Sequence, residues 1–240
     1  MEELKRAIIV AAGEGKRLRP VSLETPKPLV RVNGTRLIDT EINALKQNGI
    51  HEIIIVAGYK KEQFHEAYKD DPEITVVENV NYQRGNNITS LYAARDYLPG
   101  SFVLEGDLMI SEPAIFSRSV EKSGYCANWL DYAPEWAIRV RNGRIISCDI
   151  GGGPEAYRLW GISMWTQKDG ELLAELVRQQ IEDIKDWDVY WDQLALEVYA
   201  DRFDLGVREI RAGDIVEIDS FDELVEMDPG YLRYKKEDVR

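Results

Sequence analysis

The chain has 240 residues, of which 44% are hydrophobic and 30% are charged, and its formal net charge at pH 7 is −13. This length and apolar content can bury a substantial core, so we expect one folded domain over residues 1–240. The strong acidity disfavours nucleic acid and anionic membranes as partners. Apolar runs stay below the ~18 residues of a membrane-spanning helix and the N-terminus is acidic rather than basic, so we expect a cytoplasmic protein.

The first predicted element is a buried strand at residues 7–12, an unbroken apolar run rich in β-branched side chains. It leads into Gly-Glu-Gly at 13–15, where glycine permits positive φ and lets backbone N–H groups approach a ligand. The glycine spacing matches neither the dinucleotide fingerprint nor the P-loop. Residues 1–36 carry a net charge of +4, whereas the remaining 204 residues carry −17. Such a local positive cluster favours an anionic ligand such as phosphate, and a solvated basic loop is the alternative.

The segments that follow alternate between helix and strand. Apolar residues at helical spacing predict helices at 37–45, 61–68 and 88–97, and apolar runs predict strands at 52–58, 74–77 and 101–105. The last of these strands ends at a carboxylate, Asp107, and another helix is expected at 113–123. The alternation predicts an α/β fold with a doubly wound, mostly parallel central sheet, in which ligands bind at the carboxyl ends of the strands.

The second half of the chain has a different pattern. Two alternating runs at 136–141 and 144–149 flank Asn142-Gly143, which predicts a β-hairpin. Ser220 is expected to cap a last helix, and residues 228–240 are expected to fray or pack loosely. The remaining expected elements are a strand at 159–165, helices at 168–184 and 191–203, and short strands at 207–210 and 215–218.

Two stretches near the N-terminus resemble a known signature. Residues 11–20 read AAGEGKRLRP and residues 25–29 read TPKPL; together they resemble the motif of nucleotidyltransferases that make sugar and alcohol nucleoside diphosphates. The resemblance implies a single Rossmann-like nucleotidyltransferase domain with a small β-hairpin extension. Arg17 and Lys27 match the catalytic arginine and lysine that hold and neutralise the phosphates in that family. The residues expected to bind the nucleotide are Ala11, Ala12, Gly13, Glu14, Gly15, Lys16, Asn79, Asn86, Ser90 and Glu105.

Two aspartates match the metal-binding carboxylates of this family. Asp107 follows a predicted buried strand, and Asp219 stands in the stretch Val-Glu-Ile-Asp-Ser at 216–220. Two hard oxygen ligands completed by phosphate oxygens and water suit Mg²⁺, which we expect as the cofactor. The alternatives are a helix N-cap role for Asp219 and a turn role for Asp107.

Aromatic and acidic residues occur together at two places in the second half of the chain. Aromatic faces beside carboxylates bind ammonium groups by cation–π and Coulomb attraction, so we expect the acceptor to bind mainly within residues 125–205. Aromatic side chains that only fill the core are the alternative. The residues expected to bind the acceptor are Asp131, Glu135, Trp136, Tyr190 and Asp192.

The stretches at 86–91, 135–136, 190–192 and 217–220 resemble those of bacterial CTP:phosphocholine cytidylyltransferases, and the likeness extends from residue 5 to about 224. Two places depart from that family: Glu105-Gly106-Asp107 stands where it has Asp-x-Asp, and three glycines occur at 151–153. The departures leave open which amine is the acceptor.

The sequence therefore predicts a Mg²⁺-dependent cytidylyltransferase that joins CTP to a small zwitterionic phosphoamine or phosphonate. Phosphocholine is the first candidate acceptor, giving CDP-choline and pyrophosphate. The alternatives are 2-aminoethylphosphonate as acceptor, a sugar 1-phosphate as acceptor, and a non-catalytic nucleotide-binding regulator. The regulator would be favoured if positions 27 and 107 lacked their charged side chains, which they do not.

Overall fold

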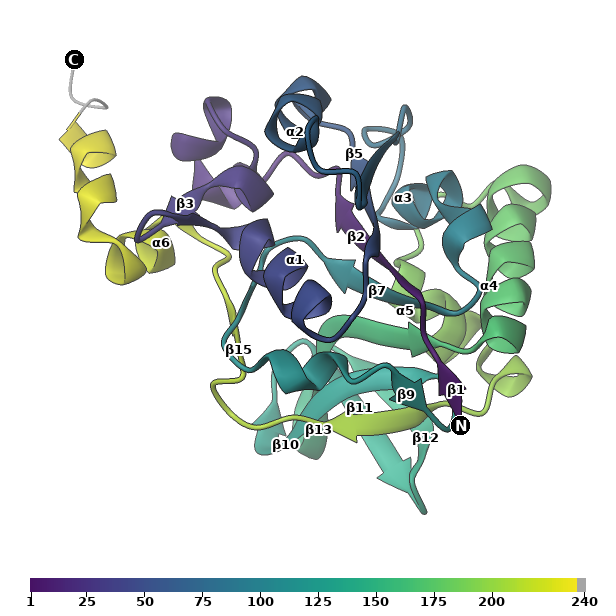
Figure 1. The fold of residues 1–240 in the computed structure, drawn as a ribbon. Helices are drawn as coiled ribbons and strands as arrows, with labels where there is room; N and C mark the ends of the chain where they lie inside the picture. The colour runs from purple at the N-terminus through teal and green to yellow at the C-terminus, as the bar shows by residue number, and fades with distance from the viewer. Residues whose placement is uncertain (237–240) are drawn as a thin grey trace.

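The computed structural model describes residues 1–236, and its centre is a nine-stranded sheet (Figure 1). Four strands run parallel in the order β7-β2-β5-β6. Antiparallel pairing of β13 with β7 extends the sheet on the other side. The predicted α/β fold with a doubly wound, mostly parallel central sheet is confirmed. The parallel strands are β2 (Arg6–Ala11), β5 (Glu52–Ala57), β6 (Ile74–Glu78) and β7 (Ser101–Glu105).

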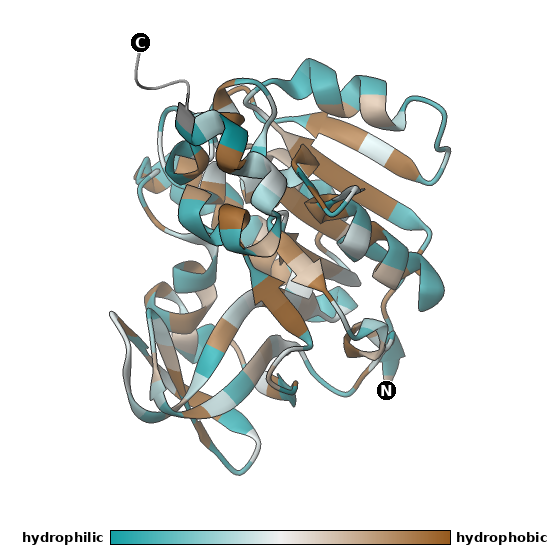
Figure 2. Cartoon of the chain, turned by 90° about the vertical axis from the view of Figure 1, so that its left-hand side faces the viewer, coloured by the Kyte–Doolittle hydropathy of each residue, from teal (hydrophilic) through white to brown (hydrophobic). Residues whose placement is uncertain are grey.

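Helices cover both faces of the parallel strands. Alternate residues of β2 point to opposite faces, so that Ile9 packs with α1 and α2 while Ile8 packs with α3 and α4. Both isoleucines are fully buried, and burial of each stabilises the fold by about 1.5–3 kcal/mol. Figure 2 shows these strands as mostly hydrophobic, as expected for a sheet covered on two sides. The longer helices are α1 (Leu37–Gln47), α2 (Lys61–Tyr68), α3 (Ile88–Ala93), α4 (Gln167–Gln179) and α6 (Phe221–Met227).

The antiparallel half contains the predicted hairpin. Its strands β11 and β12 pair around Asn142-Gly143, where both residues have positive φ, at 51° and 72°, as a tight two-residue turn requires. β13 starts at Gly153, six residues before the predicted strand, and pairs along most of its length with β10. The strands of this half are β10 (Gly124–Ala133), β11 (Trp136–Arg141), β12 (Arg144–Ile150), β13 (Gly153–Trp165) and β14 (Gly206–Glu209).

Short strands complete the molecule away from the main sheet. They form three two-stranded pairs, one of which joins the segment after β7 to the segment before α6. The pairs are β1 (Glu2–Glu3) with β9 (Ser119–Val120), β3 (Arg31–Val32) with β4 (Thr35–Arg36), and β8 (Leu108–Ile110) with β15 (Ile215–Glu217). None of the helices within residues 1–236 is long and apolar enough to cross a membrane.

Two expected helices are wrong, and one strand was not expected. The predicted helix at 113–123 is a single 3₁₀ turn, Pro113–Phe116, because the next residues pair with β1 instead. The strand β10 was not predicted, since its aromatic and acidic residues were interpreted only as ligand-binding groups. The predicted helix at 191–203 is divided into α5 (Trp191–Gln193), a π turn at Leu194–Val198 and a 3₁₀ turn at Ala200–Arg202.

The C-terminal segment is ordered further than the sequence predicts. Ser220 caps α6 with a capping box, as expected. A 3₁₀ helix, Pro229–Lys236, then follows, and the Tyr231 hydroxyl donates a hydrogen bond of 2.7 Å to the carbonyl oxygen of Arg31. The chain is thus regular rather than frayed in this helix, although most of its residues are exposed, and residues 237–240 lie outside the described part.

Candidate active site

The glycine loop after β2 has the geometry of a phosphate cradle. Gly15 has a φ of 59°, and a Cβ there would lie 2.9 Å from the Cβ of Lys27, so only glycine fits. Lys27 begins a short 3₁₀ helix, Lys27–Leu29, that packs under this loop. The loop conformation therefore brings backbone N–H groups and a buried lysine to the same edge of the sheet.

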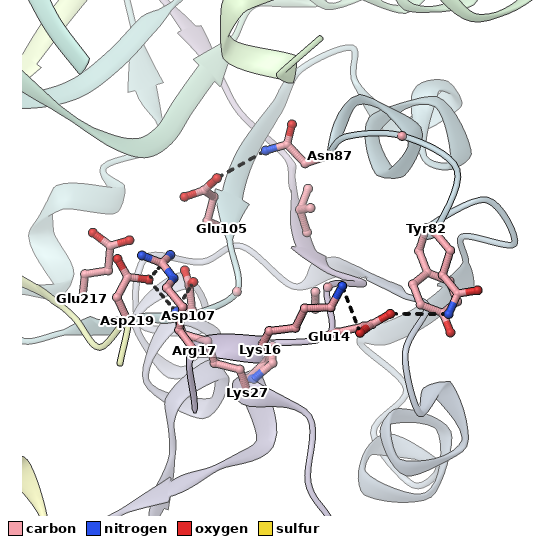
Figure 3. Close-up of a pocket in the computed structure, with 18 residues that line it drawn as sticks. Glu14, Lys16, Arg17, Lys27, Tyr82, Asn87, Glu105, Asp107, Glu217 and Asp219 are labelled. Carbon is pink, nitrogen blue, oxygen red and sulfur yellow. Dashed lines mark hydrogen bonds and ion pairs between the residues drawn. The ribbon is translucent and has the colours of Figure 1, made fainter. Parts of the chain in front are cut away.

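A cavity of about 650 Å³ opens at this edge, at the carboxyl ends of β2 and β7 (Figure 3). Its size is in the range of small-molecule sites. The cavity is lined by the expected metal ligands Asp107 and Asp219 and by residues expected to bind the nucleotide or its phosphates, namely Ala11, Gly13, Glu14, Gly15, Lys16, Arg17, Lys27 and Glu105. The stretch 79–90 was expected to contact the base, but the residues from it that line the cavity are others than those named from the sequence: Tyr82, Gln83, Gly85 and Asn87.

Lys27 lies between the two predicted metal-binding aspartates. Only 7% of the residue is exposed, and its Nζ is 2.6 Å from Asp107 Oδ2 and 2.8 Å from Asp219 Oδ1. Arg17 Nη2 lies 2.8 Å from the same Asp219 oxygen. Burial lowers the pKa of Lys27, but the two carboxylates outweigh this effect and hold its pKa above the usual range. Lys27 is therefore protonated at neutral pH.

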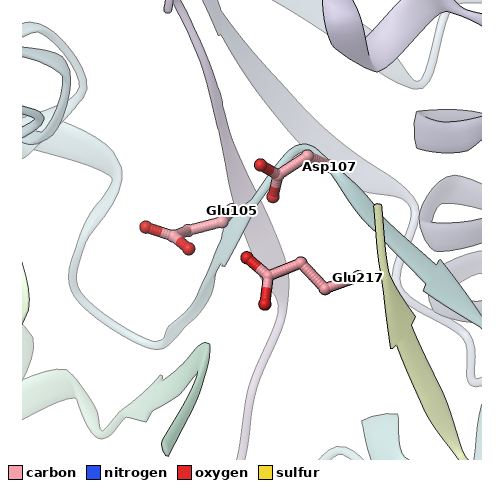
Figure 4. Close-up of side chains that lie close together, drawn as sticks. All are labelled: Glu105, Asp107 and Glu217. Carbon is pink, nitrogen blue, oxygen red and sulfur yellow. The ribbon is translucent and has the colours of Figure 1, made fainter. Parts of the chain in front are cut away.

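Four carboxylates gather where the two aspartates lie. One oxygen from each of Glu105, Asp107 and Glu217 lies within 4.8 Å of the others (Figure 4). Burial, followed by the repulsion of Asp107 and Asp219, raises the pKa of Glu217 to about 7. Asp107 Oδ1 is buried without a hydrogen-bond partner among the described residues. Such a set of hard oxygen donors could hold a divalent cation.

Glu217 was missed by sequence analysis although a signal was present. It precedes Asp219 by two residues in an extended segment, so both side chains point to the same side of the chain. Glu105 ends β7, and Asp107 lies two residues on, in the turn that follows. The spacing of Glu217 and Asp219 thus adds a second pair of acidic groups at this edge.

A second cavity of about 320 Å³ adjoins the first. The Trp136 and Tyr190 rings meet edge to face in it, with centroids 5.7 Å apart. Asp192 is buried, its Oδ1 has no hydrogen-bond partner among the described residues, and burial raises its pKa well above the usual range. The cavity is also lined by Glu135 and Trp160, and it shares Arg17, Glu105, Glu217 and Asp219 with the first cavity.

Five predicted site residues do not line either cavity as the described residues define them. Asn79 is buried, and its Nδ2 donates to the hydroxyls of Thr89 and Ser90 at 2.9 and 3.0 Å, so Asn79 and Ser90 satisfy each other inside the fold. Ala12 lies beneath the glycine loop, and its carbonyl accepts the Tyr59 N–H. The other two are Asn86, which bonds to the segment at 187–188, and Asp131, which is exposed on β10.

Comparison with known proteins agrees with this geometry. A family model described as nucleotidyl transferase matches residues 6–124. A 2-aminoethylphosphonate cytidylyltransferase from Lancefieldella rimae is 37% identical over 235 residues, covering 96% of this chain and 94% of the relative. A choline-phosphate cytidylyltransferase from Streptococcus pneumoniae is 33% identical and covers 90% of this chain and 93% of the relative.

A solved structure has the same fold along nearly the whole chain. The CTP:phosphocholine cytidylyltransferase from Streptococcus pneumoniae superimposes with a TM-score of 0.86 at 30% identity, covering 95% of this chain and 98% of that structure. Family model, relatives and fold agree. The chain therefore belongs to the nucleotidyl transferase family, and within it to the cytidylyltransferases.

Proposed function

We propose that the protein transfers the cytidylyl group of CTP to phosphocholine, giving CDP-choline and pyrophosphate. The observation that supports this most strongly is the junction of the two cavities. Arg17, Glu105, Glu217 and Asp219 line both of them, so a triphosphate in the first and a phosphoamine in the second would meet at these side chains. Bringing two reactants together in this way supplies much of the catalysis of such a transfer.

The first cavity would bind the nucleotide. Backbone N–H groups of the loop at 13–15 and the side chains of Lys16 and Arg17 would hold the β- and γ-phosphates. Lys27 would stabilise the negative charge that develops as pyrophosphate leaves, because it is a protonated cation fixed in a buried position. To do so, Lys27 and Arg17 exchange their carboxylate partners for phosphate oxygens.

The acidic cluster fits a Mg²⁺ ion, which we propose as the cofactor. Asp107, Asp219 and Glu217 would hold it, and the partnerless Oδ1 of Asp107 supports this assignment. When bound there, the ion would supply positive charge that orients and neutralises the phosphate oxygens. Release of Lys27 and Arg17 toward the phosphates frees Asp219 for this role.

The second cavity would hold the acceptor. A phosphate monoester is already an anion near neutral pH, so its oxygen can attack the α-phosphorus of CTP without a general base. The trimethylammonium group would lie against Trp136 and Tyr190, and its positive charge would favour the ionised form of the buried Asp192 carboxyl, whose pKa is raised in its absence.

A second candidate acceptor is 2-aminoethylphosphonate. The relative from Lancefieldella rimae, which is 37% identical, is named as a cytidylyltransferase of this compound. A primary ammonium also has three N–H donors, which could satisfy the partnerless Oδ1 of Asp192, whereas a quaternary ammonium has none.

The proposal is tested by offering acceptors with CTP or UTP and Mg²⁺ and measuring pyrophosphate release. The panel contains phosphocholine, 2-aminoethylphosphonate and glucose 1-phosphate. We expect release with CTP and a phosphoamine only, fastest with phosphocholine. Release with glucose 1-phosphate alone would show a sugar nucleotidyltransferase, and no release with any acceptor would favour a nucleotide-binding regulator.

A further inference from the structure

Two segments far apart in the sequence lie against each other between the cavities. The loop at 82–87 lines the first cavity, the nucleotide cavity of the proposed function. The segment at 187–192 contributes Tyr190 and Asp192 to the second cavity, which is called the ammonium pocket below. The Asn86 N–H donates to the carbonyl oxygen of Trp187 at 2.7 Å, and its Nδ2 donates to that of Asp188 at 3.4 Å. The two substrate sites are thus joined by direct hydrogen bonds.

Close packing joins the same two segments. A Cβ at Gly85 would collide with the carbonyl oxygen of Trp187 and would lie 2.7 Å from its Cβ, so the backbones touch without a side chain between them. The guanidinium of Arg84 lies over the Trp187 ring, 5.0 Å from its centroid. A shift of one segment therefore requires a shift of the other.

Asn87 connects the contact between these two segments, called the seam below, to both cavities. Its Oδ1 accepts the Trp191 N–H at 3.0 Å, and its Nδ2 donates to Glu105 Oε1 at 3.4 Å (Figure 3 shows the second bond). Trp191 is the first residue of α5, where helical N–H groups lack partners within the helix. The side chain of Tyr190 does not cap α5 in the described structure. Asn87 therefore caps this helix from 104 residues away.

We propose that Asn87 is a positioning residue that couples nucleotide binding to the shape of the ammonium pocket. A side-chain amide has one acceptor end and one donor end, so fixing its plane fixes Trp191 and Glu105 together. Trp191 lies between the pocket residues Tyr190 and Asp192, and Asn87 itself lines the nucleotide cavity. A nucleotide that packs on Asn87 thus holds the pocket in place and tightens acceptor binding, with a matching effect of the acceptor on the nucleotide.

The inference builds on the proposed donor and acceptor sites, so its first test needs no acceptor. Hydrogen–deuterium exchange of the full-length protein is measured with Mg²⁺ and a CTP analogue whose α,β-bridging oxygen is replaced by methylene. We expect the nucleotide to slow exchange in peptides covering 187–192 by about fivefold or more in the wild type, the lower range of measured coupling between sites. Asn87→Leu keeps the size of the side chain, removes both hydrogen bonds, and should abolish this protection.

Two further variants distinguish the loss of the Asn87 side-chain hydrogen bonds from a general loss of order in the two segments. Asn87→Asp keeps an acceptor for the Trp191 N–H and should retain most of the protection at 187–192. Asn86→Ala removes the side-chain hydrogen bond to the Asp188 carbonyl and the one accepted from the Asn87 N–H, but it leaves both bonds of the Asn87 side chain and lines neither cavity, so it should also retain the protection. Unchanged protection in Asn87→Leu would overturn the inference, and equal loss in Asn86→Ala would overturn the assignment to Asn87.

A second measurement distinguishes this inference from the proposed function. Calorimetric titration of phosphocholine, and separately of 2-aminoethylphosphonate, is performed with and without the nucleotide analogue. We expect the analogue to tighten acceptor binding about fivefold or more in the wild type and less than about twofold in Asn87→Leu. Tightening that persists in Asn87→Leu contradicts the coupling. If neither acceptor binds while 187–192 is still protected through Asn87, the acceptor assignment fails and the coupling stands.

Discussion

The parallel and antiparallel halves of the central sheet build their cavities in different ways. In the parallel half, the groups proposed to bind phosphate come mainly from the loops that follow β2 and β7, and the proposed catalytic cation, Lys27, is only 7% exposed. In the antiparallel half, the cavity proposed to bind the ammonium group combines the β11 hairpin, β13 and the start of α5, and Tyr190 is 44% exposed. The parallel half thus holds a fixed charge cluster, whereas the antiparallel half presents a more open surface of aromatic rings.

This difference separates chemistry from selectivity. Stabilising charge on transferring phosphates requires cations that are already held at the site, and the carboxylate partners of Lys27 hold it at the strand ends until phosphate oxygens would replace them. Choosing among small amines requires shape and polarity that vary with a few side chains. Substitutions in the parallel half should therefore lower the rate with every acceptor, and substitutions in the antiparallel half should change the ranking of acceptors.

The largest effect is expected for Lys27→Ala, which removes the buried cation from the parallel half. We expect kcat to fall roughly 10²–10³-fold with every acceptor, the scale of one preorganised electrostatic stabiliser. Pyrophosphate release measures kcat, and circular dichroism checks the fold. Lys69→Ala serves as the control, because Lys69 is an exposed lysine at the C-terminal end of α2 and lines neither cavity. Wild-type turnover in Lys27→Ala would remove this residue from the mechanism.

Trp136→Ala should weaken the use of the acceptor and leave the binding of CTP nearly unchanged. Loss of one desolvated cation–π contact corresponds to a roughly thirtyfold lower kcat/KM for phosphocholine, with the KM for CTP within about twofold. Trp129→Ala, a half-exposed tryptophan on β10 that does not line the pocket, is the control. Comparison with Glu135→Gln sharpens the test, because a primary ammonium should depend more on carboxylates. A greater loss in Glu135→Gln than in Trp136→Ala would argue for 2-aminoethylphosphonate.

Asp107→Asn should raise the Mg²⁺ concentration needed for half-maximal activity by about tenfold, because it replaces one anionic oxygen ligand and preserves shape. The measurement is a Mg²⁺ titration of initial rates at saturating CTP. Asp222→Asn is the control, since Asp222 is exposed on α6 and pairs with Lys235. An unchanged Mg²⁺ requirement would assign Asp107 a structural role, as the partner of Lys27 only.

The smallest effect concerns stability and pH in the metal-free protein. The pKa of Glu217 is raised from 4.5 to about 7 by burial, and then by the charges of Asp107 and Asp219. The folded state therefore holds this proton more tightly than the unfolded state. Its stabilisation is fully present below about pH 4.5 and is lost as pH rises through 7.

In EDTA, we expect the Tm of wild type to fall between pH 5.5 and 8 by about 4–8 °C more than that of Glu217→Gln, which cannot titrate, because the lost proton binding corresponds to about 2 kcal/mol. Differential scanning calorimetry measures the difference, and Glu66→Gln, an exposed carboxylate, is the control. Parallel curves for wild type and Glu217→Gln would show that Glu217 titrates normally.

The two halves also differ in how well the sequence predicted them. The β2 strand, the glycine loop after it and the position of Asp107 just after β7 were predicted correctly, because a buried parallel strand and the turn after it are encoded by neighbouring residues. The hairpin at Asn142-Gly143 was predicted for the same reason. Local pattern was sufficient wherever an element and its function lie in one continuous stretch.

Prediction failed where tertiary contacts decide the outcome. The segment at 119–120 is a strand only because β1 lies beside it. The helix expected at 191–203 is instead divided into α5, a π turn and a 3₁₀ turn. Asn79 was expected to bind the nucleotide, but its amide is satisfied inside the fold, and the neighbouring loop supplies Asn87 instead. The role of a polar residue depends on the hydrogen-bond partners that the fold places beside it, and these tertiary partners could not be predicted from the sequence.

The central claim is that one cavity presents CTP to a phosphoamine held in the other. A direct competition measures it: wild-type protein, CTP and Mg²⁺ are mixed with equal concentrations of phosphocholine and 2-aminoethylphosphonate, and phosphorus NMR resolves the two products and pyrophosphate. The account predicts pyrophosphate together with an excess of CDP-choline. An excess of the phosphonate product would contradict the choice of phosphocholine, and the absence of both products and of pyrophosphate would contradict cytidylyl transfer itself.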